Sequence, residues 1–368
     1  MKERIWEAMI KDNFFFAPSQ LKDAKGRSYY LDNAKFFLIF FVVLAHAVSP
    51  LKPHHATMYA LWYLLNTFHM PAFIFISGYL AKSFLKKSPV QQVQRPFTYM
   101  ILYICAQVSV SVFEKWVLHH EFSYSIFAAR SSLWFLVCLI FWYLFLPFFG
   151  RFRAGAILPM VFFLGLVVGY DASIGNGLSF SRVLVHLPFF LLGYFIDSRI
   201  FEFLKKKWVQ VLSAFILVGT FVGLFFIARY NEKLLPSKLI TCNYAYKTFM
   251  SPYPTALWWC SRLIFYVAAI VLLMAFLSLV PRCKLCITRF GSRTLAVYIL
   301  HRFLYLAYLD YDWANYFDSV GGIFLLILVA FGLTLLFSTK PFNAVFKWQQ
   351  SIKVDKLLPA SLKDKKSS

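Results

Sequence analysis

Charge is scarce in this 368-residue chain, and most of it is of one sign. Charged residues make up 15% of the sequence, against ~25% in an ordinary soluble domain, and 38 Lys and Arg outnumber 16 Asp and Glu. Hydrophobic residues reach 60%, and the mean hydropathy is +0.63. A soluble protein cannot bury so much apolar surface, so a soluble enzyme and a disordered chain are both excluded. The composition indicates an integral membrane protein.

Cysteine is also too sparse to define a framework. The six Cys are scattered, which excludes a disulfide scaffold. Cys283 and Cys286 form a C-x-x-C motif, but no second pair lies near, and a zinc site needs about four ligands. We therefore expect no metal. A secretory leader is not expected either, because the first apolar run begins near Ala34, after about thirty mostly polar residues.

Long apolar runs, by contrast, are abundant. Their lengths predict an all-α integral membrane protein with about ten transmembrane helices, and they lack the ~10-residue alternation of an outer-membrane barrel. The expected spans are Ala34–Ser49, Tyr59–Ala81, Phe97–Leu118, Leu133–Phe149, Ala154–Tyr170, Val183–Ile196, Trp208–Ala228, Ser261–Val280, Thr294–Leu309 and Val320–Ser338.

The distribution of basic residues predicts the orientation. Most Lys and Arg lie in the N-terminal stretch, in every second loop and in the C-terminal tail, which the positive-inside rule assigns to the cytoplasm together with both termini. The net charge of +22 thus reflects topology, and we expect no nucleic-acid partner. We divide the chain into a cytoplasmic amphipathic segment (1–33), a ten-helix membrane domain (34–339) and a basic cytoplasmic tail (340–368).

The first span carries the sharpest chemical signal. Lys35 and His46 are eleven residues apart, so they share one helix face, separated by roughly 16 Å along the axis. This separation suits the pantetheine arm of a coenzyme A thioester, with Lys35 at the phosphates and His46 at the acyl group. Asp32 or Asn33 is expected to cap this helix. Alternatively, Lys35 only snorkels to the inner surface as a topology residue.

Further ionisable residues lie within the spans, where they are functional candidates by default. His69 could orient a substrate or His46, or could be a satisfied packing residue, and Gly78 in the same span permits close helix approach. For His186 and His301 the sequence likewise allows either a functional role or a packing role.

Three residues near the outer surface have simpler interpretations. Glu114 can pair with its neighbour Lys115, and Trp134 is expected to be an interfacial anchor. The long outer loop from about Arg229 to Cys260 is rich in aromatics and proline, and it either covers an outer cavity or is a plain connector.

Five motifs in order resemble those of the membrane-bound acyltransferase 3 family, particularly its fucose 4-O-acetylase-like and polysaccharide-modifying branch. The resemblance extends from about Tyr30 to Ser338. Its motifs are Y-L-D-N-A-K-x10-H, H-M-P-A-F-I-F-I-S-G-Y, L-W-F-L-V-C-L-I-F-W-Y, P-F-F-L-L-G-Y and S-R-T-L-A-V-Y-I-L-H.

The resemblance implies ten transmembrane helices, a cytoplasmic acyl-CoA donor, most simply acetyl-CoA, and O-acylation of a glycan or sugar hydroxyl. It also implies a multi-pass protein of a bacterial plasma membrane. The family's first-helix Arg is Lys35 here, which keeps the charge but loses the bidentate fork, and its His is His46. Of the family's paired Arg residues three apart, only Arg95 is present, because the earlier position is Gln92.

These observations lead to a mechanistic hypothesis. His46 acts as general base or transient acyl carrier, with His69 positioning it or the acceptor. Lys35 and Arg95 hold the coenzyme A phosphates, and His301 belongs to the donor channel. Two alternatives remain at this point: a proton-coupled exporter of a glycan or lipid-linked sugar, and a non-catalytic subunit of a polysaccharide synthase.

Overall fold

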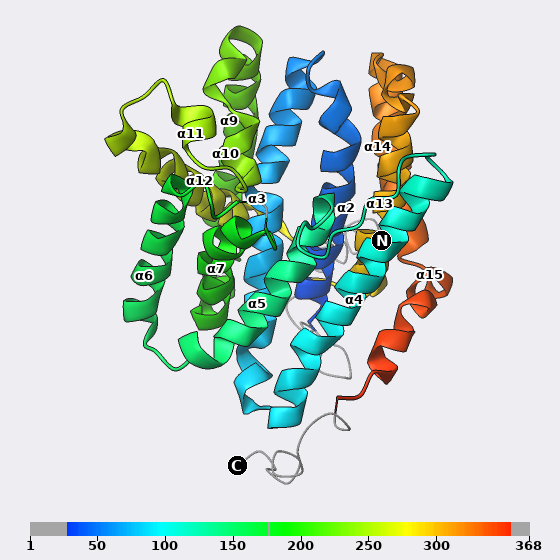
Figure 1. Ribbon diagram of the computed structural model, residues 1–368. Helices are drawn as coiled ribbons and strands as arrows, with labels where there is room; N and C mark the ends of the chain where they lie inside the picture. Colours follow the sequence, from blue (N-terminus) through cyan, green and yellow to red (C-terminus); the bar gives the residue numbers. More distant parts are fainter. Residues whose placement is uncertain (1–27, 176, 355–368) are drawn as a thin grey trace, which may run out of the picture.

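The computed structural model describes residues 28–175 and 177–354, which form fourteen α-helices joined by turns and short 3-10 helices (Figure 1). No β-strand occurs in these residues. Most of the expected amphipathic segment (1–33) and most of the basic tail lie outside them, and residues 29–33 belong to α2. Each of the ten apolar runs corresponds to one helix. These are α2 (Tyr29–Val48), α3 (Ala56–Leu80), α4 (Pro89–Trp116), α5 (Trp134–Phe149), α6 (Ala154–Val167), α7 (Phe180–Phe195), α9 (Lys207–Asn231), α12 (Trp258–Leu279), α13 (Thr294–Asp310) and α14 (Val320–Phe337).

Among the described residues, six helices are long and apolar enough to cross a membrane, and α5, α6 and α7 are shorter apolar helices. The protein is therefore an all-α, multi-pass membrane protein, as the composition predicts; the number ten and the orientation stay predictions. We call the end at which α2 begins the inner end, following the charge asymmetry, and the opposite end the outer end. The inner end also holds the short helices α8 (Arg199–Phe203) and α15 (Lys340–Val345), and the outer loop contains α10 (Ser237–Thr241) and α11 (Lys247–Met250).

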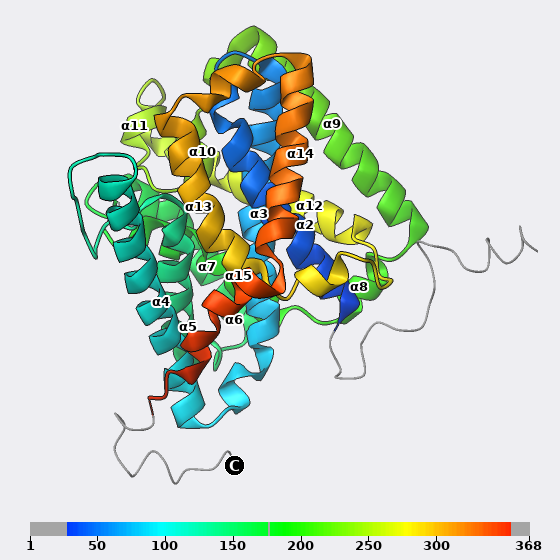
Figure 2. The same cartoon turned by 90° about the vertical axis from the view of Figure 1, so that its right-hand side faces the viewer.

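The helices run roughly along one direction, and α9 leans against one edge of the bundle (Figures 1 and 2). Helix α3 lies at the centre, because it packs against α2, α7, α9 and α12. This arrangement places α3 beside α2 and α7, which carry His46 and His186.

The first helix begins earlier than the sequence predicts. Ser28 is the N-cap, and its side chain accepts a hydrogen bond from the Leu31 amide, so Asp32 lies inside the first turn. Asp32 forms an ion pair with Lys35 at 2.8 Å. The cap prediction was wrong because the helix continues one turn beyond the apolar run that was used to place its start.

The side chain of Asn33 joins the inner end of α2 to the loop that follows α12. Its amide donates hydrogen bonds to the carbonyls of Pro281 and Cys283, both at 2.9 Å, and its oxygen accepts one from Thr288 Oγ1 at 2.6 Å. These bonds fix the height and rotation of α2, and with them the positions of Lys35 and His46.

Glycines allow α3 and α7 to approach each other closely, as expected for Gly78. A Cβ added at Gly78 would collide with the carbonyl of Phe190, and one added at Gly193 would collide with the carbonyl of Phe75. Small residues on both helices therefore bring the backbones into direct contact.

We predict that Gly193→Leu lowers stability by on the order of 1–3 kcal/mol or prevents folding, because the new side chain must push α7 away from α3. The measurement is the thermal unfolding midpoint of the detergent-solubilised protein. Gly219→Leu on α9 is the control, since nothing lies within 4 Å of an added Cβ there. Equal midpoints for the two variants would contradict the close α3–α7 contact.

Candidate functional site

A cavity of about 210 Å³ lies among α2, α3, α5, α7, α13 and the outer loop, and we call it the histidine cavity. Its walls are formed by Val42, Ala45, His46, Ser49, Trp62, Asn66, His69, Met70, Ser132, Trp134, Arg182, His186, Ile240, Thr241, Tyr298 and Tyr305. The set unites three histidines, one arginine and several aromatic rings from segments far apart in the sequence. A polar and aromatic chamber of this kind inside an apolar bundle is a candidate active site.

His46 is half-buried near the outer end of α2 and lines the cavity. Its ring lies 4.7 Å from the ring of Tyr305 and 5.3 Å from the ring of His301, measured between centroids. None of the described residues forms a hydrogen bond with the imidazole of His46. Both ring nitrogens are therefore available to a substrate.

The other three histidines share one arrangement. The Nδ1 atoms of His69, His186 and His301 lie 2.5, 3.1 and 2.8 Å from the carbonyl oxygens four residues earlier in their own helices. A carbonyl only accepts, so Nδ1 carries the proton in each ring. In the neutral imidazole, Nε2 is then a free acceptor. For His69 and His186, which line the histidine cavity, this atom is the one left for a substrate hydroxyl.

Arg182 joins α7 to the outer loop at the edge of the cavity. Its Nε donates to the carbonyl of Thr241 at 2.9 Å, and its guanidinium lies 5.0 Å from the ring centre of Trp134. Ser181 donates to the carbonyl of Cys242 at 3.0 Å. The outer loop thus folds onto the bundle and supplies Ile240 and Thr241 to the cavity wall, which favours the covering role among the two interpretations of this loop.

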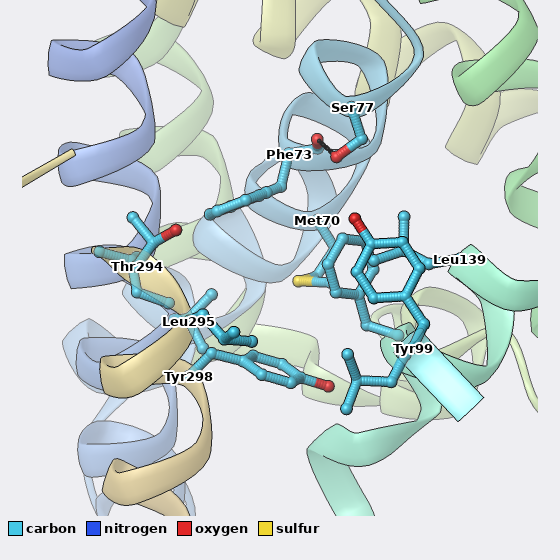
Figure 3. A pocket seen from close by; sticks show the side chains of 12 residues that line it. Met70, Phe73, Ser77, Tyr99, Leu139, Thr294, Leu295 and Tyr298 are labelled. Atoms are coloured by element: carbon cyan, nitrogen blue, oxygen red, sulfur yellow. Dashed lines mark hydrogen bonds between the residues drawn. The ribbon is translucent and has the colours of Figure 1, made fainter. Parts of the chain in front are cut away.

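A second cavity of about 200 Å³ lies nearer the inner end, and we call it the inner cavity; Figure 3 shows the side chains that line it. The two cavities share Val42, Met70 and Tyr298 as wall residues. In Figure 3, Met70 of α3, Tyr99 of α4 and Tyr298 of α13 surround one space. The two cavities therefore follow one another between the inner part of the bundle and His46, with these three side chains between them, and we call the pair the passage.

The two expected phosphate-binding residues lie beyond the inner cavity. Lys35 is one turn inward of Ile39 on α2, and Arg95 is one turn inward of Tyr99 on α4; Ile39 and Tyr99 both line the cavity. The guanidinium of Arg95 lies 5.0 Å from the ring centre of Tyr143. Both cations are therefore close to the inner mouth of the passage, on helices that contribute to its walls.

The structure distributes the predicted site residues over two places. His46 and His69 meet at the histidine cavity, whereas Lys35 and Arg95 lie near the inner mouth. His301 lies beside His46, with 5.3 Å between the ring centroids, and it is not among the wall residues of the inner cavity. Its expected place in the donor channel stays a prediction.

Sequence reasoning missed several cavity residues, among them Arg182, Tyr298 and Tyr305, whereas His186 was among the candidates. Arg182 and His186 are four residues apart on α7, and Tyr298 and Tyr305 are seven apart on α13, so each pair shares a helix face, and this periodicity was the signal available in the sequence. Trp134 was expected only as an interfacial anchor, which stays a prediction; the structure places it in the cavity wall, with its ring centre 5.3 Å from that of His186.

The expected pairing of Glu114 with Lys115 was wrong. Glu114 forms an ion pair with Arg130, which additionally donates to the carbonyl of Ser123 at 2.6 Å. Adjacent helical residues point in different directions, so Glu114 faces inward while Lys115 is exposed. In the described part of the chain, no group of three His, Cys, Asp or Glu is arranged to hold a metal ion.

Comparison with known families gives one match. The family model of acyltransferase 3, described as an acyltransferase domain, matches residues 28–339, which include the ten helices that correspond to the apolar runs and the wall residues of both cavities. No curated protein and no solved structure matches the chain.

We predict that Arg182→Ala loosens the outer loop, because it removes the hydrogen bond to Thr241 and the contact with Trp134. Hydrogen–deuterium exchange of residues 237–250 in nanodiscs should become at least about tenfold faster, as expected for the loss of a charge-assisted hydrogen bond. Arg229→Ala changes an exposed base near the same loop and should leave this exchange unaltered. Unchanged exchange in Arg182→Ala would show that the loop is held by other contacts.

Proposed function

Because the chain belongs to the acyltransferase 3 family and is an acyltransferase of the membrane, we propose that it is an O-acyltransferase with a coenzyme A donor. It moves an acyl group, acetyl in the simplest case, from cytoplasmic acyl-CoA to a hydroxyl of a cell-envelope glycan or sugar. The fucose 4-O-acetylase-like branch, a plasma-membrane location and a bacterial source are part of this proposal.

The observation that supports it best is the order of the two cavities along α2. Lys35 and His46 lie on one unbroken helix, roughly 16 Å apart; the inner cavity is lined by Ile39 and Val42, which lie between them, and the histidine cavity surrounds His46. A donor that must keep its phosphates in water while its thioester reaches a buried base needs such a passage. An extended pantetheine arm has a matching length.

Charge at the inner mouth suits the nucleotide part of the donor. Lys35 and Arg95 provide the cations for the phosphates, and Arg95 is held in place by its contact with Tyr143. Lys35 exchanges its ion pair with Asp32 for the phosphate when the donor binds. The negative charge of Asp32 in the first turn keeps the ammonium of Lys35 at the helix start while the site is empty.

The chemistry takes place at His46. The imidazole removes the proton from the acceptor hydroxyl as its oxygen attacks the thioester carbonyl, so that a C–O bond forms and the C–S bond breaks. The same proton then passes to the departing coenzyme A thiolate. His69 and His186 accept hydrogen bonds from the acceptor through Nε2, and the guanidinium of Arg182 faces the negative charge that develops on the carbonyl oxygen.

The walls of the histidine cavity suit a sugar acceptor. Trp62, Trp134 and Tyr305 offer flat apolar faces for a pyranose ring. The side-chain amide of Asn66 donates to the carbonyl of Trp62 at 2.7 Å, which leaves its oxygen to accept from a sugar hydroxyl. An acceptor that enters beneath the outer loop meets these groups before it reaches His46.

We predict that His46→Gln lowers acyl transfer by about 10²–10⁴-fold, because the glutamine cannot take up the proton. The measurement is release of coenzyme A thiol from acetyl-CoA by protein in nanodiscs, with an envelope glycan extract as acceptor. His54→Gln alters an exposed histidine in the turn before α3 and should keep the wild-type rate. Wild-type turnover by His46→Gln would remove this residue from the mechanism.

We also predict that Lys35→Ala weakens acetyl-CoA binding by about tenfold or more through the loss of a charge-assisted contact with phosphate. Calorimetric titration in nanodiscs measures this. His46→Ala should bind within a few-fold of wild type, since it lies at the opposite end of the passage. Lys340→Ala, an exposed base at the inner end, controls for general loss of positive charge.

Donor binding also separates the enzyme from its rivals. A folded protein that binds neither acetyl-CoA nor succinyl-CoA would contradict the proposed function and favour a glycan exporter.

A further inference from the structure

A third cavity, of about 270 Å³, opens from the same histidine that the proposed mechanism uses. It lies between α2, α13 and α14, beneath the 3-10 helix Trp313–Phe317, and we call it the side cavity. It shares two wall residues with the histidine cavity, His46 and Tyr305. One end of the side cavity, which we call its mouth, is thus beside His46, where the proposed function places the thioester carbonyl.

The lining of the side cavity is almost wholly apolar. Aliphatic side chains from three helices form most of it, among them Val43, Leu326, Ala330 and Leu333, and no Asp, Glu, Lys or Arg is present in its wall. A sugar or a carboxylate would lose its hydration in such a space without gaining partners. The chemistry of the wall favours a hydrocarbon occupant.

Two wall residues carry a buried polar atom without a hydrogen-bond partner among the described residues, Nε2 of His301 and the hydroxyl of Tyr308, one at each end of the cavity wall on α13. Since Nδ1 of His301 is bonded to the carbonyl of Val297, Nε2 is the ring nitrogen left for a ligand beside His46. A buried acceptor left unpaired carries an energetic cost, which a reacting hydroxyl at the mouth would remove.

The dimensions of the side cavity exceed an acetyl group. Along α13 its wall extends from His301 to Tyr308, and along the antiparallel α14 from Leu333 to Leu326. Seven residues correspond to roughly 10 Å, on the order of a chain of six to eight carbons. An acetyl group at His46 would leave most of this space unfilled.

We propose that the side cavity receives the acyl chain of the donor, and that the protein accepts aliphatic acyl groups longer than acetyl. This inference rests on the proposed function, because the chain must begin at a thioester beside His46. The pantetheine arm then occupies the inner cavity, the acyl chain continues into the side cavity, and the acceptor approaches through the histidine cavity. The side cavity and the histidine cavity meet at His46, and the inner cavity adjoins the histidine cavity at Val42, Met70 and Tyr298.

The test is the relative affinity of acyl-CoA donors for the protein in nanodiscs. Titrations use acetyl-, butyryl- and hexanoyl-CoA, with empty nanodiscs subtracted. Each methylene that leaves water adds up to about fourfold in affinity, so hexanoyl-CoA should bind at least about tenfold more tightly than acetyl-CoA. The ratio of the two affinities is the quantity to compare among variants.

Two variants fill the side cavity from different sides. Ala330→Leu projects from α14 at a buried wall position, and Leu333→Phe adds volume one turn nearer the mouth. Either substitution should bring the hexanoyl-to-acetyl affinity ratio down to about one, and the second variant serves if the first does not fold. Gly332→Leu is the matched control on the same helix, because Gly332 is exposed and nothing lies within 4 Å of an added Cβ.

The outcomes separate the inference from the function on which it rests. A wild-type ratio near one, or a ratio that both filled variants leave unchanged, would overturn the side-cavity assignment while donor binding itself stands. An unchanged ratio together with altered co-purifying lipid would assign the space to a membrane lipid instead, since Leu304, Trp313 and Val329 at its rim are exposed on the surface of the bundle. Failure to bind any acyl-CoA would overturn both proposals.

Discussion

Inside an apolar bundle, each polar side chain finds few hydrogen-bond partners. This constraint determines the ring orientation and the tautomer of the histidines. His69, His186 and His301 each give the Nδ1 proton to a carbonyl of their own helix. This hydrogen bond within one helix fixes the ring orientation without a contact from a neighbouring helix. It also fixes the tautomer, so that Nε2 is the acceptor atom. His46 differs from the other three because no described residue bonds to its ring, and its freedom on both nitrogens is what a group that takes up and releases a proton requires.

The positions of these rings depend on two contacts of different kinds. Close glycine packing between α3 and α7 brings His69 and His186 to one chamber. The hydrogen bonds of Asn33 hold the inner end of α2 against the loop after α12, and thereby fix the level of His46 on the same helix. A change far from the chamber can therefore alter its geometry, because both contacts act through rigid helices.

Much of the fold follows from the sequence, because apolar runs of helical length have few alternatives in a membrane. Each expected run is a helix, and the eleven-residue interval from Lys35 to His46 lies on a single one. The helix start was misplaced, because the signal used was hydrophobicity and the turn beginning at Tyr29 is mixed in character. Arg182 and Trp134 were missed as site residues for another reason: their neighbours come from α5, α7 and the outer loop, and one sequence without structure contains no record of which helices are adjacent. His301 could be recognised as a candidate from the sequence. Its contact with His46 could not, because the sequence does not show that α13 lies beside α2.

The wall shared by the inner cavity and the histidine cavity has a consequence for the cell. Val42, Met70 and Tyr298 lie between the inner cavity and the histidine cavity. Met70 is unbranched and readily changes rotamer, so it can yield to a slender thioester arm and close behind it. Aliphatic and thioether surfaces offer a hydrated ion no substitute for its water shell. Under the proposed function, the side chains that admit the donor would therefore also act as an ionic seal, so that the membrane keeps its electrochemical gradient during acyl transfer.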